Sequence, residues 1–204
     1  MAGYRSIFEF WRGDLTLVAE PPGFSGSVLR PGHCFTGPLT YFAMGSSGTP
    51  GIVARILESF AGQPYRVIAP VRFQIAQMGR VRVPPNVVVT EWLPALEVNR
   101  MADLAVIHGG IGTVMTAALA GKPVVGVGMQ MEQVANLACL ERLEFAIRVP
   151  KSRDPSRRVQ KAIRRLLYDE TARKKAAAFA EEAARWDGPE PSAEALLQRY
   201  GPRS

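Results

Sequence analysis

The chain has 204 residues, of which 47% are hydrophobic and 21% are charged, values typical of a globular protein of about one domain. No apolar run is long enough to span a bilayer, and the N-terminus lacks the layout of a signal peptide. Cys34 and Cys139 are far apart in sequence, so we expect free thiols and a cytoplasmic location. With only two histidines, a histidine-based metal site is not expected.

The formal net charge is +7, which raises the question of a nucleic-acid partner. The densest basic run, residues 151–165, has the pattern of an amphipathic helix with a solvated basic face. It has no interleaved aromatic residues and matches no nucleic-acid module, so nucleic-acid binding is not expected. A basic field also suits a small phosphorylated ligand or an acidic membrane surface. Of these two, we expect the phosphorylated ligand and no membrane association.

The first 37 residues differ from the rest of the chain. A short strand at 15–19 is followed by an irregular run that contains several Pro-Gly pairs, including the one before His33. This segment is too short to bury a core of its own. It is expected to be the end of an upstream domain or an arm packed on the body.

From residue 40 onward, strand and helix patterns alternate. Strands are expected at 41–44, 66–69, 87–90, 104–107, 124–127 and 146–149. Helices are expected at 50–60, 95–101, 114–119, 131–143, 155–167, 171–186 and 192–199, and residues 71–83 remain unassigned. This alternation predicts an α/β fold, a Rossmann-like doubly wound parallel sheet with extra C-terminal helices.

The most informative stretch is a buried strand, 104–107, that runs into His108-Gly-Gly-Ile-Gly-Thr113 and then into a helix. A strand, a glycine-rich turn and a helix start together aim free backbone N–H groups and a helix dipole at an anion. Thr113 can cap this helix or donate its hydroxyl. A bare tight turn is the alternative, but a histidine at the carboxyl end of the strand favours a phosphate site.

Polar residues follow two other strands, and in a parallel sheet these loops open on one edge. The turn 45–49 contributes Ser46, Ser47 and backbone amides. The loop 128–133 places Gln130, Glu132 and Gln133 at a helix start, where a carboxylate and an amide can grip the vicinal hydroxyls of a sugar. Glu132 could equally be a first-turn acid that complements the helix dipole.

These motifs, taken in order, resemble a known signature. The sequence carries Trp92-x-Pro94, then His108-Gly-Gly-x-Gly-Thr113, Ala120-Gly-Lys-Pro123, and Glu132-Gln133 with Asn136. This set is similar to the donor-binding signature of GT-B glycosyltransferases, above all the UDP-glycosyltransferase and macrolide (antibiotic) glycosyltransferase group. The resemblance covers about residues 14–200.

The resemblance implies a role for each motif. Trp92 would pack on the base of a UDP- or dTDP-linked sugar donor, although a tryptophan in a loop can also be simple packing. The diphosphate would be held by Ser46, Ser47, His108, Gly109, Gly110, Gly112 and Thr113. The donor sugar would be bound by Gln130, Glu132 and Gln133. Such enzymes transfer the sugar with inversion to a hydroxyl-bearing small molecule and need no metal or other cofactor.

The chain departs from the family at several positions. Thr116 stands where many members have a glutamate that holds the ribose, and Glu144 where a glycine often follows the helix. Residues 1–37 resemble only the end of the family's N-terminal acceptor domain, and 38–204 its donor-binding domain. The general base of the family lies in the N-terminal domain, so no catalytic residue is assigned. We expect the isolated chain to be inactive without that domain or a partner subunit. A non-catalytic nucleotide or nucleotide-sugar binding module is the alternative.

Overall fold

The computed structural model describes residues 16–18, 33–35, 37–44, 49–78, 80–185 and 189–201. Its centre is a six-stranded sheet in the order β5-β4-β3-β6-β7-β8, and every neighbouring pair is parallel. The strands are β3 (Leu39–Ala43), β4 (Arg66–Ala69), β5 (Val87–Val89), β6 (Leu104–Ile107), β7 (Val124–Gly126) and β8 (Ala146–Arg148). The predicted doubly wound parallel sheet is confirmed.

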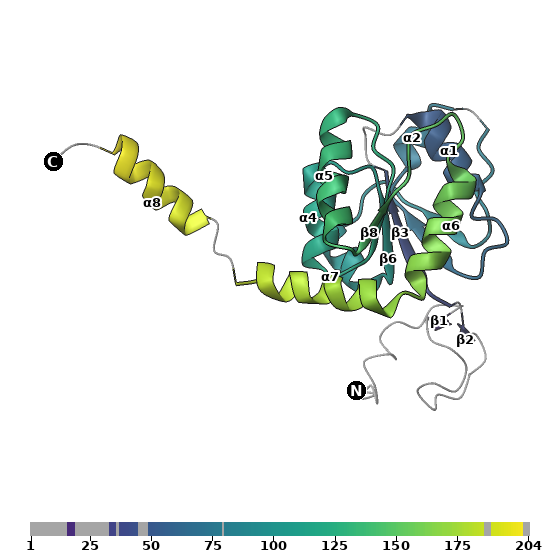
Figure 1. Ribbon diagram of the computed structural model, residues 1–204. Coiled ribbons are helices and arrows are strands. Elements are labelled where there is room, and N and C mark those ends of the chain that lie inside the picture. Colours follow the sequence, from purple (N-terminus) through teal and green to yellow (C-terminus); the bar gives the residue numbers. More distant parts are fainter. Residues whose placement is uncertain are drawn as a thin grey trace, which may run out of the picture.

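Helices cover both faces of this sheet (Figure 1). One layer contains α1 (Pro50–Glu58), α2 (Arg72–Ala76) and α6 (Ser156–Leu167). The other contains α3 (Ala95–Met101), α4 (Ile111–Leu119) and α5 (Met131–Arg142), and α7 (Glu170–Ala183) packs against α4. The last helix, α8 (Pro189–Tyr200), stands away from the body in Figure 1. No helix among the described residues is both long and apolar enough to cross a membrane.

The winding reverses at the centre of the sheet. From β3 the chain continues outward to β4 and β5, and from β6 it continues in the opposite direction to β7 and β8. The two central strands β3 and β6 pair directly, with Ala43 opposite Ile107 at their carboxyl ends. In open parallel sheets the crevice at this reversal point is where ligands bind.

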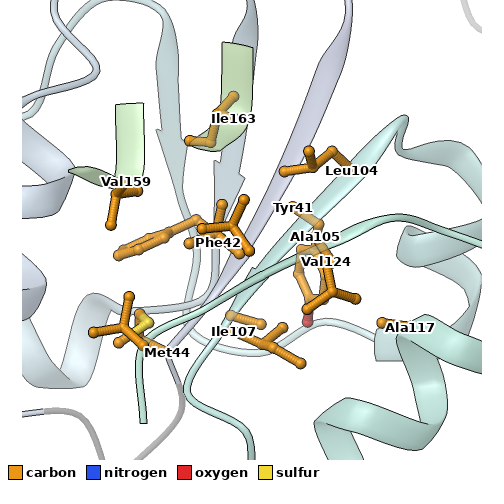
Figure 2. Close-up of a cluster of buried hydrophobic side chains, with 14 of the residues drawn as sticks. Tyr41, Phe42, Met44, Leu104, Ala105, Ile107, Ala117, Val124, Val159 and Ile163 are labelled. Carbon is orange, nitrogen blue, oxygen red and sulfur yellow. The ribbon is translucent and has the colours of Figure 1, made fainter. Parts of the chain in front are cut away.

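The core follows the two-residue period of the central strand. Tyr41, Phe42 and Met44 are all buried. Figure 2 shows Phe42 and Met44 near Val159 of α6, whereas Tyr41 lies on the side of Ala117 of α4. Successive side chains of a strand point to opposite faces, so one strand supplies apolar surface to both helical layers. The carboxyl edge of the sheet is thereby held rigidly between two packed layers.

Several sequence expectations need correction. The irregular run after residue 31 contains a strand, β2 (His33–Phe35), which pairs in parallel with β1 (Thr16–Val18), so His33 lies in a strand rather than in a turn. Helix α4 begins at Ile111, earlier than expected. In α6, Pro155 is the N-cap rather than the first helical residue, because its carbonyl accepts the first intrahelical bond from the Val159 amide at 3.0 Å.

Glu144 has the backbone conformation that a glycine would normally supply. It follows the end of α5 with φ +61°, in the left-handed region, and it is the non-glycine residue with positive φ among those described. Left-handed residues commonly terminate helices, and glycine adopts this conformation at least cost. Glu144 is a departure from the family, yet the helix ends in the left-handed conformation that a glycine would supply, and the side chain of Glu144 makes an ion pair to Lys175.

Candidate active site

His108 lies at the reversal point, directly after β6. Its imidazole is 6% exposed, and Nδ1 is 3.4 Å from the carbonyl oxygen of Ala43 at the end of β3. Burial lowers the pKa of His108, while the Ala43 carbonyl and the charge of Glu132 act in the opposite direction. The imidazole is therefore a neutral hydrogen-bonding group that joins the two central strands. It is buried beneath the carboxyl edge of the sheet and not exposed on its surface.

The two glycines after His108 are required by close packing. Gly109 has φ +93°, and a Cβ on it would lie 2.7 Å from both the Gln133 carbonyl oxygen and Leu137 Cγ. A Cβ on Gly110 would lie 2.7 Å from His108 Nε2. The turn can thus pass between the imidazole and α5 only without side chains.

The turn ends in an open helix N-terminus. Gly110 is the N-cap of α4 in extended conformation, and the first intrahelical bond runs from the Val114 amide to its carbonyl at 3.0 Å. The amides of Ile111, Gly112 and Thr113 consequently have no carbonyl partner within the helix. Ile111 and Gly112 are exposed, and a Cβ on Gly112 would meet nothing within 4 Å, so the helix start is open beside Gly112. This arrangement binds anions well.

Thr113 does not cap α4. Its hydroxyl donates to the Gly110 carbonyl at 2.8 Å, and the helix has no side-chain cap among the described residues. The hydroxyl oxygen retains lone pairs, but its proton is already engaged. Of the two roles considered for Thr113, the helix cap is therefore wrong. Helix α4 starts two residues before Thr113, so Thr113 lies inside the helix and not at the N-cap.

The start of α5 adjoins the glycine turn. Glu132 is exposed in the first turn, and its Oε1 accepts a hydrogen bond from Asn136 Nδ2 at 2.7 Å. The same Asn136 nitrogen donates to the Gly109 carbonyl at 3.0 Å. Gln130 is the exposed N-cap residue of the helix. Gln133, in contrast, is 2% exposed, and its Oε1 accepts from the Met129 amide at 2.9 Å. Its side chain therefore holds the loop in place.

Loops from other strands meet at the same edge. The Thr49 hydroxyl lies 4.0 Å from Met129 Sδ, and Lys151 Nζ donates to the Met129 carbonyl at 3.3 Å. Trp92 follows β5 with 76% of its surface exposed, so its ring is available for stacking. Ser46 and Ser47 lie outside the described residues. Among the described residues, no three metal-binding side chains come together.

The pKa of His108 has a consequence for stability. A histidine whose pKa is lowered from 6.5 by folding is protonated more readily in the unfolded chain. Stability should therefore be full above that value and fall as the pH decreases toward the folded pKa. Urea unfolding between neutral pH and about pH 5.5 should show a steeper loss for the wild type than for His108→Gln. Equal slopes for the two proteins would contradict the buried neutral imidazole.

A family model matches this chain over residues 56–198: Erythromycin biosynthesis protein CIII-like, C-terminal domain. The chain belongs to this family. A curated relative, the PGL/p-HBAD biosynthesis glycosyltransferase of Mycobacterium tuberculosis, is 30% identical over 199 residues, which cover 83% of this chain and 45% of that protein. The chain thus spans about half the length of the curated relatives that it matches.

Solved structures show the same fold. The glycotransferase of kitacinnamycin superposes with a TM-score of 0.69 at 22% identity, covering 89% of this chain and 47% of that one. The glycosyltransferase VinC in complex with dTDP has a TM-score of 0.65 at 18% identity, covering 92% of this chain and 48% of that one. The architecture of this EryCIII-like domain is therefore that of the C-terminal half of GT-B glycosyltransferases.

The structure gives site contacts to two further residues of this EryCIII-like domain. Asn136, known from the sequence as part of the signature, connects the glycine turn to Glu132. Its spacing of four residues from Glu132 on one helix was an available signal. Lys151 brings a cation to the Met129 loop from the segment after β8, and no local pattern in the sequence pointed to it.

Proposed function

We propose that this chain is the donor-binding domain of an inverting, metal-independent glycosyltransferase that moves a sugar from a nucleoside diphosphate to a hydroxyl of a small-molecule acceptor. The observation that carries the proposal is the open N-terminus of α4 at the reversal point of the sheet, beside His108. Backbone amides fixed at a helix start stabilise the negative charge that develops on a departing diphosphate. This charge stabilisation requires no metal ion.

The exposed groups around the helix start divide among the parts of such a donor. The amides from Ile111 to Thr113 suit the diphosphate, with His108 as a neutral hydrogen-bonding neighbour. The Glu132 carboxylate and Gln130 suit the sugar hydroxyls. Gln133 supports the sugar-binding loop through its contact with the Met129 amide. Ser46 and Ser47 remain candidate diphosphate ligands.

Trp92 suits the base at the far end of the donor. It follows β5, and β5 is three positions from β6 in the sheet, a separation of about 14 Å at the usual strand spacing. A ligand with a flat base at one end and a diphosphate at the other fits this separation. Thr116, half-buried on α4, offers only a hydroxyl near the ribose position, and its proton is donated to the Thr113 carbonyl at 3.1 Å. The similar VinC structure, a complex with dTDP, favours dTDP over UDP.

Catalysis requires a second domain in this proposal. No side chain at the described edge is placed to deprotonate an acceptor, because His108 is buried against Ala43 and Glu132 is held by Asn136. The acceptor and the general base would come from an N-terminal domain or from a partner subunit. The isolated chain would bind donor and transfer little sugar.

Binding of dTDP and UDP to the full chain tests the proposal. We expect both nucleotides to raise the unfolding temperature and to bind with measurable heat in calorimetry, dTDP more tightly than UDP. At a free concentration one hundred times the Kd, the stabilisation would be about 2.7 kcal/mol. A folded protein that responds to neither nucleotide would contradict the proposal.

A second measurement separates an enzyme from a non-catalytic binding module. The chain is incubated with a dTDP-sugar and a hydroxyl-bearing aglycone, with and without a candidate N-terminal domain. Turnover that appears only on complementation supports a glycosyltransferase. Nucleotide binding without turnover in any combination supports the binding module.

A further inference from the structure

The charges of this chain are segregated between the two layers that cover the sheet. We define the basic layer as residues 49–94 and 150–168, which comprise α1, α2 and α6, the strands β4 and β5 and the adjoining loops. It contains 12 Lys and Arg but only three acidic residues, Glu58, Glu91 and Asp154. The rest of the body, residues 95–149 and 169–185, has eight basic and nine acidic residues. The excess positive charge of the chain therefore lies on one side.

The basic layer does not neutralise itself. Glu91 pairs with Arg72 at 3.5 Å, Glu58 accepts from the Arg82 backbone amide at 3.2 Å, and Asp154 accepts from the Ser156 amide. Among the described residues of this layer, Arg72 has an ion pair and the other Lys and Arg side chains have none. Most of its positive charge is thus left to solvent or to a partner.

Helix α6 shows why these charges face outward. Its apolar and small residues, such as Val159 and Ile163, are fully buried against the sheet. The intervening positions are exposed and basic: Arg157, Arg158, Lys161, Arg164 and Arg165. Burial of one face of an amphipathic helix forces the opposite face into solvent, so the core itself fixes the orientation of the basic face.

Helix α2 and the segment between it and β5 add exposed apolar groups to the same layer. Phe73, Met78 and Val83 have 65%, 37% and 40% of their surfaces exposed. Arg80 and Arg82 lie between them in sequence and are also exposed. Apolar side chains interleaved with cations match a bilayer interface, where the cations contact headgroups and the apolar groups enter the acyl boundary.

We infer that the basic layer binds an anionic membrane surface, with Phe73, Met78 and Val83 inserted between the headgroups. The phosphates of a nucleic acid would also pair with the basic side chains. They would make no apolar contact with Met78 and Val83, because phosphate contacts require only cations. This inference revises the expectation from the sequence, in which the basic face of residues 151–165 was solvated and no membrane association was expected. The residues that carry it, the basic face of α6 and segment 73–83, are not among those assigned to the donor.

Vesicle flotation tests the inference. The full chain is mixed with phosphatidylcholine vesicles with and without phosphatidylglycerol, at low and high salt. We expect binding to the anionic vesicles alone, weakened by salt. Removal of one cation near the surface should weaken binding about fivefold, so Arg80→Gln/Arg82→Gln should lose about 25-fold. Phe73→Ser should also weaken binding, and it should do so even at low salt because it removes apolar contact.

The control variant Arg142→Gln/Lys174→Gln removes the same charge from exposed positions outside the basic layer. It should bind vesicles as the wild type does. Equal losses in the two double variants would overturn the inference, because net charge alone would then explain binding. The absence of vesicle binding would also overturn it, and so would binding of mixed-sequence DNA by a chain that ignores anionic vesicles. Circular dichroism of each variant confirms that it is folded.

Discussion

Gly109→Ala should destabilise the protein by about 3 kcal/mol, through both backbone strain and steric conflict. At φ +93° an alanine is strained whatever space it has. Its Cβ would also lie 2.7 Å from the carbonyl oxygen of Gln133, a backbone atom that cannot move without shifting α5. Urea unfolding followed by circular dichroism measures the loss.

A second substitution tests whether the loss comes instead from a clash with the Leu137 side chain alone. If the clash with the Leu137 side chain alone were responsible, Leu137→Ala would rescue Gly109→Ala. We expect no rescue, because the strained φ and the Gln133 carbonyl remain. In contrast, Leu137→Ala should partly rescue Gly126→Ala, because the three atoms nearest to a Cβ on Gly126 all belong to the Leu137 side chain. An unfolding midpoint of Gly109→Ala equal to that of the wild type would contradict this account.

Gly112→Glu should abolish nucleotide binding and leave the fold intact. A Cβ on Gly112 meets nothing within 4 Å, so a side chain is tolerated. A helical glycine replaced by an acid in the first turn should leave the stability unchanged or raise it by up to about 1 kcal/mol. The carboxylate would, however, occupy the amide cluster and repel a diphosphate, which costs several kcal/mol, or a loss of affinity of roughly a hundredfold or more.

Gly112→Gln is the matched control, because it has nearly the same shape without the charge. Calorimetric titration with dTDP should show a much smaller loss for Gly112→Gln than for Gly112→Glu. Equal affinities for both variants and the wild type would mean that the start of α4 is not the anion site, and the proposed diphosphate position would then be wrong.

The sheet could be predicted from the sequence because its signals are local. Runs such as 104–107 are buried on both faces, and β4 and α3 begin and end where their patterns predicted. Segment 71–83 could not be assigned, because its single short helix, α2, has no buried residue and hence no apolar period. The N-terminus of α4 was placed too late, because the glycines that begin it are poor helix formers.

The candidate site was predictable only in part. The glycine turn and the helix start at 131 are where the motifs indicated, whereas α4 begins at 111 instead of 114. The hydrogen-bond partners of each side chain could not be predicted, because they depend on segments far apart in sequence. Gln133 is committed to the Met129 amide, and Asn136 connects Glu132 to Gly109.

By itself, the sequence determined the order of strands and helices, the glycine turn after His108 and the family resemblance that the match over residues 56–198 confirms. Only the tertiary structure decided that His108 is buried and neutral against Ala43, and that nearly all excess positive charge lies on the layer of α1, α2 and α6. The physical reason is that backbone patterns depend on neighbours along the chain. Burial and charge segregation arise only when strands 64 residues apart pair, as Ala43 does with Ile107, and when the helices pack on one face or the other.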